Sequence, residues 1–154
     1  MNNPRTNGKV ALITGTSSGF GHGMVGRLLD EGFTVIATMR QSDRRGGIFA
    51  PERSRHGERL VLAELDVTSG SDRARISDMI ATRFGGKLDV LVNNAGFGLF
   101  GALEDMDEEQ IARQMDVNFL AVTFLTRKLL PALRAAKGRV INISSFFGVS
   151  AAPL

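Results

Sequence analysis

The sequence contains no cysteine, no tryptophan and no tyrosine, and its only histidines are His22 and His56. Without cysteine the chain has no disulfide, no thiolate ligand for zinc and no cysteine nucleophile. Two histidines leave little for a histidine-based metal centre, so we expect no metal site. Residues 1–8 are polar and too short for a signal peptide, and no apolar run is long enough to cross a bilayer. We therefore expect a cytoplasmic protein without membrane contact.

The composition that remains is that of a globular protein. The chain has 154 residues, of which 43% are hydrophobic, a fraction too high for a disordered chain. This length suits one domain or a part of one. We expect a polar tail over residues 1–8 and one domain over residues 9–154, without repeats or a second domain.

Positive charge is concentrated in the first part of the chain. The formal net charge is +3, and six arginines lie in residues 40–59. Such a stretch indicates either an anion site or a solvated loop. We do not expect nucleic-acid binding, because Asp43, Glu52 and Glu58 lie among these arginines and no aromatic stacking platform accompanies them.

Short apolar segments alternate with segments of helical periodicity. The pattern predicts strands over residues 9–14, 33–38, 59–65, 88–92 and 139–143, and helices over residues 19–31, 71–84 and 108–133. Such alternation with short connections builds a parallel sheet with helices on both faces, so we predict the α/β class. Residues 41–58 are polar and are interrupted by Gly46, Gly47 and Pro51, so we expect mostly loop with at most a short helix.

The same periodicity predicts which helix faces are buried. The first helix should bury Phe20, Met24 and Leu28. The long helix should start at the capping residue Asp107, with Pro131 kinking or weakening its last turns. Its apolar stripe contains Ile111, Met115, Val122, Leu129 and Leu133. Asn118 lies on that stripe, and a buried amide there must be hydrogen-bonded, either within the fold or to a water in a site.

A glycine motif, Gly15-x-x-x-Gly19-x-Gly21, directly follows the first predicted strand and opens a helix. Such a turn lets backbone N–H groups and the helix start approach a pyrophosphate without obstruction by a Cβ atom. An ordinary glycine turn is the alternative, and the strand–turn–helix context favours a dinucleotide site. The residues of this turn that we expect to contact the dinucleotide are Gly15, Ser17, Ser18, Gly19, Phe20 and Gly21.

The end of the second predicted strand bears on the choice of dinucleotide. An acidic residue there binds the ribose 2′-hydroxyl of NAD, whereas an arginine accommodates the 2′-phosphate of NADP. Residues 37–40 contain no carboxylate and end on Arg40, which favours NADP(H), with NAD(H) possible. A solvated loop arginine is the alternative, and the choice between Arg40, Arg44 and Arg45 stays open.

Polar or small residues also follow the three remaining strands. Asp66 and Val67 follow the third strand, where a carboxylate can accept from an adenine amino group or simply lie at a helix start. Asn93-Asn94-Ala95-Gly96 follows the fourth strand, as a ligand contact or as ordinary turn chemistry. Ser144 and Ser145 follow the fifth, where a serine without a His–Asp partner suits a hydrogen-bond donor better than a nucleophile.

Taken together, these motifs resemble the short-chain dehydrogenase/reductase family. The matching residues, in the family's order, are Thr14-Gly15-x-x-x-Gly19-x-Gly21, Asp66, Asn93-Asn94-Ala95-Gly96, Asn118 and Ser145 in Ile143-Ser144-Ser145-x-x-Gly148. The resemblance implies a Rossmann-type doubly wound sheet of strand order 3-2-1-4-5 and NAD(P)-dependent oxidation of an alcohol or reduction of a carbonyl. It also implies two catalytic residues: Ser145 as a donor to the substrate carbonyl, and Asn118 as the holder of a relay water.

The family's acid–base pair is a Tyr-x-x-x-Lys motif, and this chain has no tyrosine. The motif should follow Ser145 by slightly more residues than the sequence contains. We therefore expect residues 9–154 to be an incomplete dinucleotide-binding domain, truncated before the later strands and inactive alone. The alternative is a stand-alone, non-catalytic nucleotide-binding or interaction module.

The sequence indicates the class of substrate and the oligomeric state only in general terms. The loop Phe97-Gly98-Leu99-Phe100 suggests an apolar mouth suited to a lipophilic alcohol or carbonyl, although these phenylalanines could equally be core residues. The family resemblance implies a homo-oligomer that pairs through the helix over residues 108–133.

Overall fold

The computed structural model describes residues 8–146. Residues 1–7 of the expected tail over residues 1–8, and Gly148 of the serine motif, lie outside the described residues. The described chain forms one parallel sheet of five strands in the order β3-β2-β1-β4-β5. The strands are β1 (Val10–Thr14), β2 (Thr34–Met39), β3 (Leu60–Glu64), β4 (Val90–Asn93) and β5 (Arg139–Asn142). The α/β class and the strand order are thereby confirmed.

The central strand β1 explains why its sequence is apolar throughout. All five of its residues are buried, because Leu12 is paired with Ile36 of β2 on one side and with Leu91 of β4 on the other. A strand covered by helices on both faces and by strands on both edges presents no surface to water.

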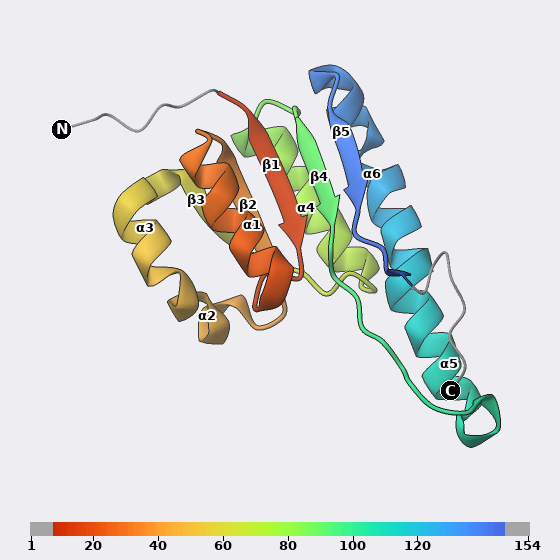
Figure 1. The fold of residues 1–154 in the computed structure, drawn as a ribbon. Helices are drawn as coiled ribbons and strands as arrows, with labels where there is room; N and C mark the ends of the chain where they lie inside the picture. Colours follow the sequence, from red (N-terminus) through yellow and green to blue (C-terminus); the bar gives the residue numbers. More distant parts are fainter. Residues whose placement is uncertain (1–7, 147–154) are drawn as a thin grey trace.

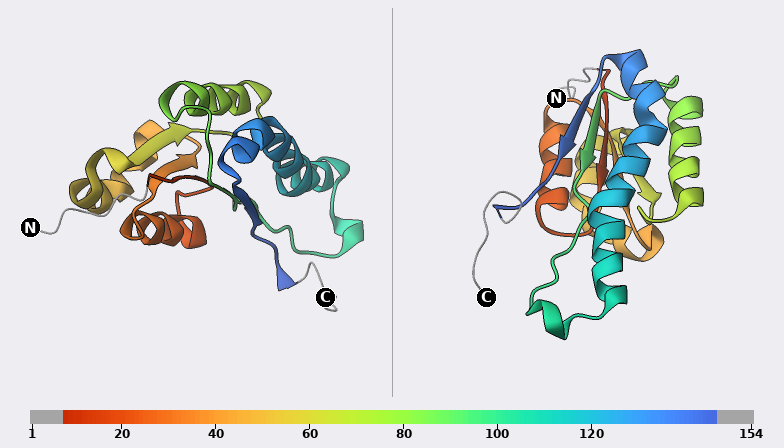
Figure 2. Two further views of the ribbon diagram at one scale, coloured as in Figure 1. Left: turned by 90° about the horizontal axis from the view of Figure 1, so that it is seen from above. Right: turned by 90° about the vertical axis from the view of Figure 1, so that its right-hand side faces the viewer.

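Two layers of helices cover the sheet (Figures 1 and 2). On one face, α4 (Gly70–Arg83) and α6 (Ala121–Ala136) place Ile80 and Leu129 against Leu12. On the other face, α1 (Gly19–Asp30) packs Val25 and Leu29 into a second apolar cluster. The sheet thus lies between two separate hydrophobic cores, as in doubly wound folds.

The buried face of α1 is shifted by one position along the chain from the predicted one, which consisted of Phe20, Met24 and Leu28. Its buried positions are Gly21, Val25 and Leu29, whereas Phe20 is 82% exposed. The reason is the close approach of Gly21 to the turn after β1, where an added Cβ would collide with the carbonyl oxygen of Gly15. This contact fixes the rotation of the helix and turns Phe20 outward.

The expectation of a loop over residues 41–58 is wrong. This segment forms α2 (Ser42–Arg45), a 3₁₀ turn (Gly46–Phe49), α3 (Ala50–His56) and a second 3₁₀ turn (Gly57–Arg59). Pro51 lies in the first turn of α3, where its missing N–H is not needed. Phe49 is fully buried and anchors the segment to the core.

The long helix begins where predicted but is not a single regular helix. Asp107 and Gln110 form the expected capping box at the start of α5 (Glu108–Met115), which follows a 3₁₀ turn (Leu103–Asp105). A π-helical turn (Asp116–Leu120) joins α5 to α6, which continues through Pro131 to Ala136. The proline therefore does not end the helix.

The apolar stripe of this helix is buried only in its second half. In α6 the buried residues are Ala121, Leu125, Leu129 and Leu133. The first half extends beyond the sheet, as Figure 2 shows, so Met115 is 51% exposed and Ile111 is also exposed. The prediction of a stripe from Ile111 to Leu133 is thus wrong for α5, because no sheet lies beneath it.

Strand β5 lies at an edge of the described sheet. It pairs with β4 along one side, and its four residues are exposed.

In residues 8–146 no helix is long and apolar enough to span a bilayer. The same residues contain no group of metal-binding side chains that could hold an ion.

Gly138 allows α6 to return to the sheet, and it provides a test of this packing. An added Cβ would collide with the carbonyl oxygen of Leu88 and lie 2.9 Å from that of Asp89, so Gly138→Ala should lower the free energy of unfolding by about 1–3 kcal/mol. The matched change Gly23→Ala, in open space within α1, should instead raise it by about 0.5–1 kcal/mol. Urea titration followed by circular dichroism measures both, and equal stability of the two variants would contradict the packing.

Candidate functional site

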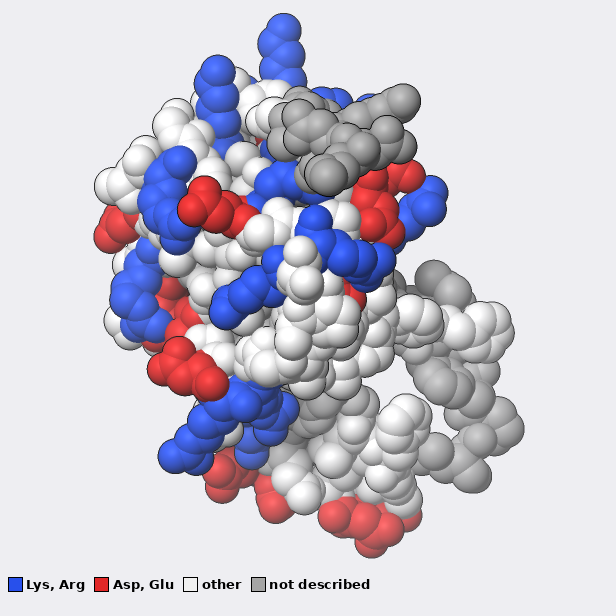
Figure 3. All heavy atoms as spheres, turned by 90° about the vertical axis from the view of Figure 1, so that its left-hand side faces the viewer, with Lys and Arg blue, Asp and Glu red and all other residues white. Residues whose placement is uncertain are grey.

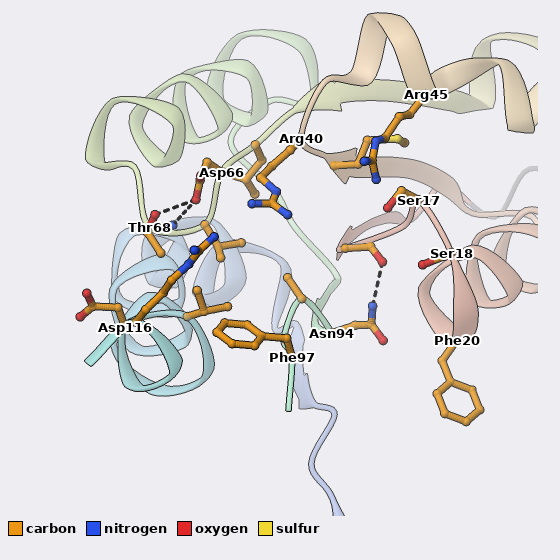
Figure 4. Close-up of a pocket in the computed structure, with 18 of the residues that line it drawn as sticks. Ser17, Ser18, Phe20, Arg40, Arg45, Asp66, Thr68, Asn94, Phe97 and Asp116 are labelled. Carbon is orange, nitrogen blue, oxygen red and sulfur yellow. Dashed lines mark hydrogen bonds between the residues drawn. The ribbon is translucent and has the colours of Figure 1, made fainter. Parts of the chain in front are cut away.

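A cavity of about 820 Å³ opens at the carboxyl edge of the sheet. Figure 4 shows side chains from several elements around it. Its walls come from the segments after β1, β2, β3 and β4, from α5 and from the start of the π-helical turn. The lining residues are Gly15, Ser17, Ser18, Phe20, Met39, Arg40, Arg45, Leu65, Asp66, Val67, Thr68, Asn94, Ala95, Gly96, Phe97, Leu99, Gln110, Arg113, Asp116 and Val117. Ligands of doubly wound sheets bind at this edge.

The structure brings most of the predicted cofactor-binding residues to this one cavity. Those that line it are Gly15, Ser17, Ser18, Phe20, Arg40, Asp66, Val67, Asn94, Ala95 and Gly96. Gly19 and Gly21 lie beside the cavity wall, in the first turn of α1. The Phe20 ring points away from the cavity in Figure 4, so this residue offers its backbone rather than its side chain.

The three glycines of the motif have different roles. Gly15 has a φ of +69°, and an added Cβ there would lie 2.8 Å from Cα of Ala95. Gly21 has the equivalent close approach to Gly15 itself, so both of these glycines serve the packing of the protein. Gly19 has a φ of +57° and open space around its Cβ position, which makes it the glycine that a ligand could approach.

The hydroxyl of Thr14 joins the turns after β1 and β4. It accepts hydrogen bonds from the backbone N–H groups of Asn94 and Ala95, each at 2.9 Å, and donates to the carbonyl of Val92 at 3.4 Å. Thr14 is 1% exposed and Asn94 and Ala95 are half-buried, so these hydrogen bonds are partly shielded from water. Sequence reasoning missed this role, although Thr14 begins the motif that resembles the family's and ends an otherwise apolar strand.

Asn93 and Asn94 both act within the fold. The side-chain amide of Asn94 donates to the carbonyls of Thr14 and Gly15 at 2.8 and 3.0 Å, which holds the glycine turn in place. The amide of Asn93 donates to Thr126 and to its partner in register, Asn142. The turn-chemistry alternative therefore accounts for these side chains, while Ala95 and Gly96 present their backbone to the cavity.

The six arginines of residues 40–59 divide between the cavity and the outer face. Arg40 and Arg45 line the cavity, and Figure 4 shows the Arg40 guanidinium directed into it and Arg45 beside Ser17. Arg59 instead donates to the carbonyls of Leu29 and Phe33 and secures the end of α1. On the face that carries α2 and α3, basic and acidic side chains are mixed (Figure 3).

Asp66 is held at the cavity rim by its own turn. Its Oδ1 accepts from the backbone N–H and the hydroxyl of Thr68, at 2.9 and 2.7 Å. Both bonds end on Oδ1, so neither occupies Oδ2. The N–H of Asp66 donates to Asp72. Burial raises the pKa of Asp72, but this bond, together with hydrogen bonds from Arg75 and Ser69, holds that pKa below its ordinary value.

The predicted catalytic residues lie outside the cavity wall. Asn118 is exposed, so the expectation that it is buried is wrong: it lies in the π-helical turn, in the part of the long helix that extends beyond the sheet. Its amide exchanges two hydrogen bonds with the backbone of Phe97, donating to O at 2.8 Å and accepting from N at 3.1 Å. Ser145 is exposed in the segment after β5.

The wall formed by α5 and the start of the π-helical turn was not foreseen from the sequence. Gln110, Arg113, Asp116 and Val117 line the cavity. Their spacing of three, six and seven residues places them on one face of the helix. The pattern was available in the sequence, but only the packing of the loop after β4 shows that this face meets the cavity: Leu99 N–H donates to Gln114 at 2.9 Å.

Comparisons with known proteins agree with this geometry. A model of the short chain dehydrogenase family matches residues 9–154. The 3-ketodihydrosphingosine reductase of Bacteroides thetaiotaomicron is 37% identical over 147 residues, which are 94% of this chain and 50% of the reductase. Retinol dehydrogenase 8 of Bos taurus is 35% identical over 150 residues, covering 95% of this chain and 46% of that enzyme.

A solved structure adds a likeness in three dimensions. An alcohol dehydrogenase from the archaeon Thermococcus sibiricus, complexed with 5-hydroxy-NADP, matches with a TM-score of 0.87 and 30% identity over 94% of this chain and 61% of that enzyme. The chain spans about half the length of the curated relatives it matches.

Removal of the Thr14 hydroxyl tests its role in joining the two turns. Thr14→Val keeps the shape of the side chain but leaves the amides of Asn94 and Ala95 without an acceptor, so it should lower the free energy of unfolding by roughly 2 kcal/mol or more. Thr14→Ser keeps the hydroxyl and serves as the control. Urea titration of the three proteins measures the difference, and a Thr14→Val protein as stable as Thr14→Ser would refute the role.

Proposed function

The chain belongs to the short chain dehydrogenase family, and on that premise we propose that its cavity binds NADP(H) for the oxidation of an alcohol or the reduction of a carbonyl. The cavity volume of about 820 Å³ is in the range of small-molecule and cofactor sites. The complex of the Thermococcus sibiricus enzyme with 5-hydroxy-NADP supports a cofactor of this kind.

The observation that carries the NADP(H) preference is a pair of arginines after β2, with Arg40 directly after the strand and Arg45 at the end of α2. The described lining residues from this part of the chain are Met39, Arg40 and Arg45, none of which is acidic. A guanidinium group binds a phosphate through two parallel charged hydrogen bonds, whereas a ribose hydroxyl needs an acceptor. This wall therefore suits a 2′-phosphate better than a free 2′-hydroxyl.

The start of α1 suits the pyrophosphate of the same cofactor. Ser18 has extended backbone geometry before the helix, and in the described chain its side chain makes no capping hydrogen bond. The first turn of α1 contains no acidic residue, and Gly19 is open to approach. Free amide groups at a helix start attract an anion.

For catalysis we propose the division of roles that the resemblance implies. A bound nicotinamide cofactor supplies or accepts the hydride. Ser145 would donate a hydrogen bond to the substrate oxygen, and Asn118 would hold a water while its pairing with Phe97 fixes the loop. No tyrosine occurs in the 154 residues, so we infer that turnover needs an acid–base group that this chain does not supply in the family's manner.

We further propose a lipophilic substrate and a homo-oligomer. The relatives named for ketodihydrosphingosine and retinol act on lipophilic molecules by those names, and Phe97 is exposed at the cavity. Phe119 and Phe124 are exposed on the π-helical turn and α6, which favours a partner helix along residues 108–133.

Binding of the two cofactors to arginine variants tests the 2′-phosphate assignment. We expect the chain to bind NADPH more tightly than NADH, and Arg40→Ala should weaken NADPH binding about tenfold or more while leaving NADH binding nearly unchanged. Arg44→Ala is the matched control, because Arg44 lies on the same segment but not among the cavity-lining residues. Isothermal titration calorimetry of the three proteins with each cofactor measures the six dissociation constants.

The arginine assignment would be contradicted by equal affinities of the wild type for NADPH and NADH. It would also be contradicted if Arg40→Ala weakened the binding of both cofactors by the same factor, since the two molecules differ only in the 2′-phosphate.

The pyrophosphate position is tested separately at Gly19. Asparagine tolerates a positive φ better than other L-residues, and the Cβ position of Gly19 is open, so Gly19→Asn should fold. Its side chain would nevertheless obstruct the helix start, and binding of NADPH and NADH should fall together by about tenfold or more. Retention of wild-type affinity for both cofactors, measured by calorimetry, would remove the pyrophosphate from this turn.

A further inference from the structure

We propose that Glu64 is a positioning residue for the 2′-phosphate: it holds the turn that carries Arg40 and Arg45, an inference that rests on the proposed NADP(H) function. Glu64 is the last residue of β3 and is paired in register with Met39, the last residue of β2. It is not among the residues that line the cavity in the described chain.

Both carboxylate oxygens of Glu64 are bound to the turn after β2. Oε1 accepts from the backbone N–H of Gln41 at 2.9 Å. Oε2 accepts from the backbone N–H of Ser42 at 2.9 Å and from its hydroxyl at 3.3 Å. Both oxygens are thus bound to the turn, and Glu64 is not among the residues that line the cavity, so its carboxylate acts on the turn and not directly on a ligand.

The turn needs such a partner because its backbone is strained. Gln41 has a φ of 56° and a ψ of 49°, and it is one of two non-glycine residues with positive φ in residues 8–146. This left-handed conformation costs an ordinary L-residue about 1–2 kcal/mol. Without the two backbone hydrogen bonds that Glu64 accepts, we expect the backbone at Gln41 to relax to another conformation.

The same residue connects Glu64 to both arginines. Arg40 directly precedes Gln41, so the φ and ψ of Gln41 set the direction in which the chain leaves Arg40. The carbonyl of Gln41 accepts from the N–H of Arg45 at 3.0 Å. A continuous path therefore leads from the Glu64 carboxylate through the Gln41 peptide groups to the backbone of Arg45, and Arg40 and Arg45 both reach the cavity.

The ionised form of Glu64 is the one that accepts these bonds. The backbone hydrogen bonds from Gln41 and Ser42 hold the pKa of Glu64 below its ordinary value. The carboxylate is thus charged at neutral pH, and its negative charge lies near the wall where we place a phosphate.

Because Glu64 is charged, a purely electrostatic role and a positioning role predict opposite effects of Glu64→Gln on NADP⁺ binding. If Glu64 acted on the phosphate only through its charge, Glu64→Gln would remove a repulsion and strengthen NADP⁺ binding. If Glu64 acts by positioning, the same substitution weakens NADP⁺ binding, because a glutamine side chain has one acceptor oxygen where the carboxylate has two.

The experiment is isothermal titration calorimetry of NADP⁺ and NAD⁺ with the wild type, Glu64→Gln and Glu58→Gln. Glu58→Gln is the charge-matched control in the second 3₁₀ turn, and it should bind both cofactors as the wild type does. For Glu64→Gln we expect the dissociation constant of NADP⁺ to rise roughly threefold to tenfold, and that of NAD⁺ to change less than about twofold.

Each other outcome overturns the inference in a distinguishable way. Unchanged or tighter NADP⁺ binding by Glu64→Gln would show that the carboxylate does not position the arginines. An equal loss for both cofactors would show a structural role alone. A wild type that binds NADP⁺ and NAD⁺ alike would overturn the proposed NADP(H) preference itself, and the inference with it.

Discussion

The Thr14 hydroxyl lies where the carboxyl ends of β1 and β4 meet, and it fixes this part of the cavity by accepting hydrogen bonds from two half-buried backbone amides. The turns after these strands approach so closely that Gly15 leaves no space for a Cβ atom against Ala95. Backbone groups that the protein partly shields from water are stabilised by a hydrogen-bond partner within the fold. The threonine provides it, and the glycine turn is thereby held open on the side of Gly19.

The rest of the cavity rim is fixed by similar hydrogen bonds from side chains to the backbone of neighbouring turns. Glu64 binds the turn after β2 to the end of β3, and Asp72 binds the N–H of Asp66 in the turn after β3. Asn118 binds the loop after β4 to the π-helical turn. A site built in this way is largely preformed, which reduces the conformational entropy that a ligand must overcome on binding.

The sequence was sufficient for the strands and for most of the helices, because apolar runs and helical periodicity report burial directly. The strand order came from the family resemblance, since alternation of strands and helices does not determine which strands are neighbours. The failures have a common cause in tertiary contacts. Gly21 rotates α1 through its contact with Gly15, and Phe49 orders residues 41–59 by its burial. Asn118 is exposed because the π-helical turn that carries it extends beyond the sheet.

In the candidate site, too, some residues could be predicted from the local sequence and others depend on tertiary contacts. Residues that line the cavity could be proposed because they follow strands, whereas Thr14 and Glu64 act through partners distant in the chain, with Glu64 23 residues from Gln41.

The measurement that tests the account most directly is a crystal structure of the chain with NADP⁺ bound. We predict that the 2′-phosphate lies within hydrogen-bonding distance of Arg40 or Arg45 and the pyrophosphate against Gly19. A cofactor bound elsewhere, or one with its 2′-phosphate directed away from both arginines, would contradict the account.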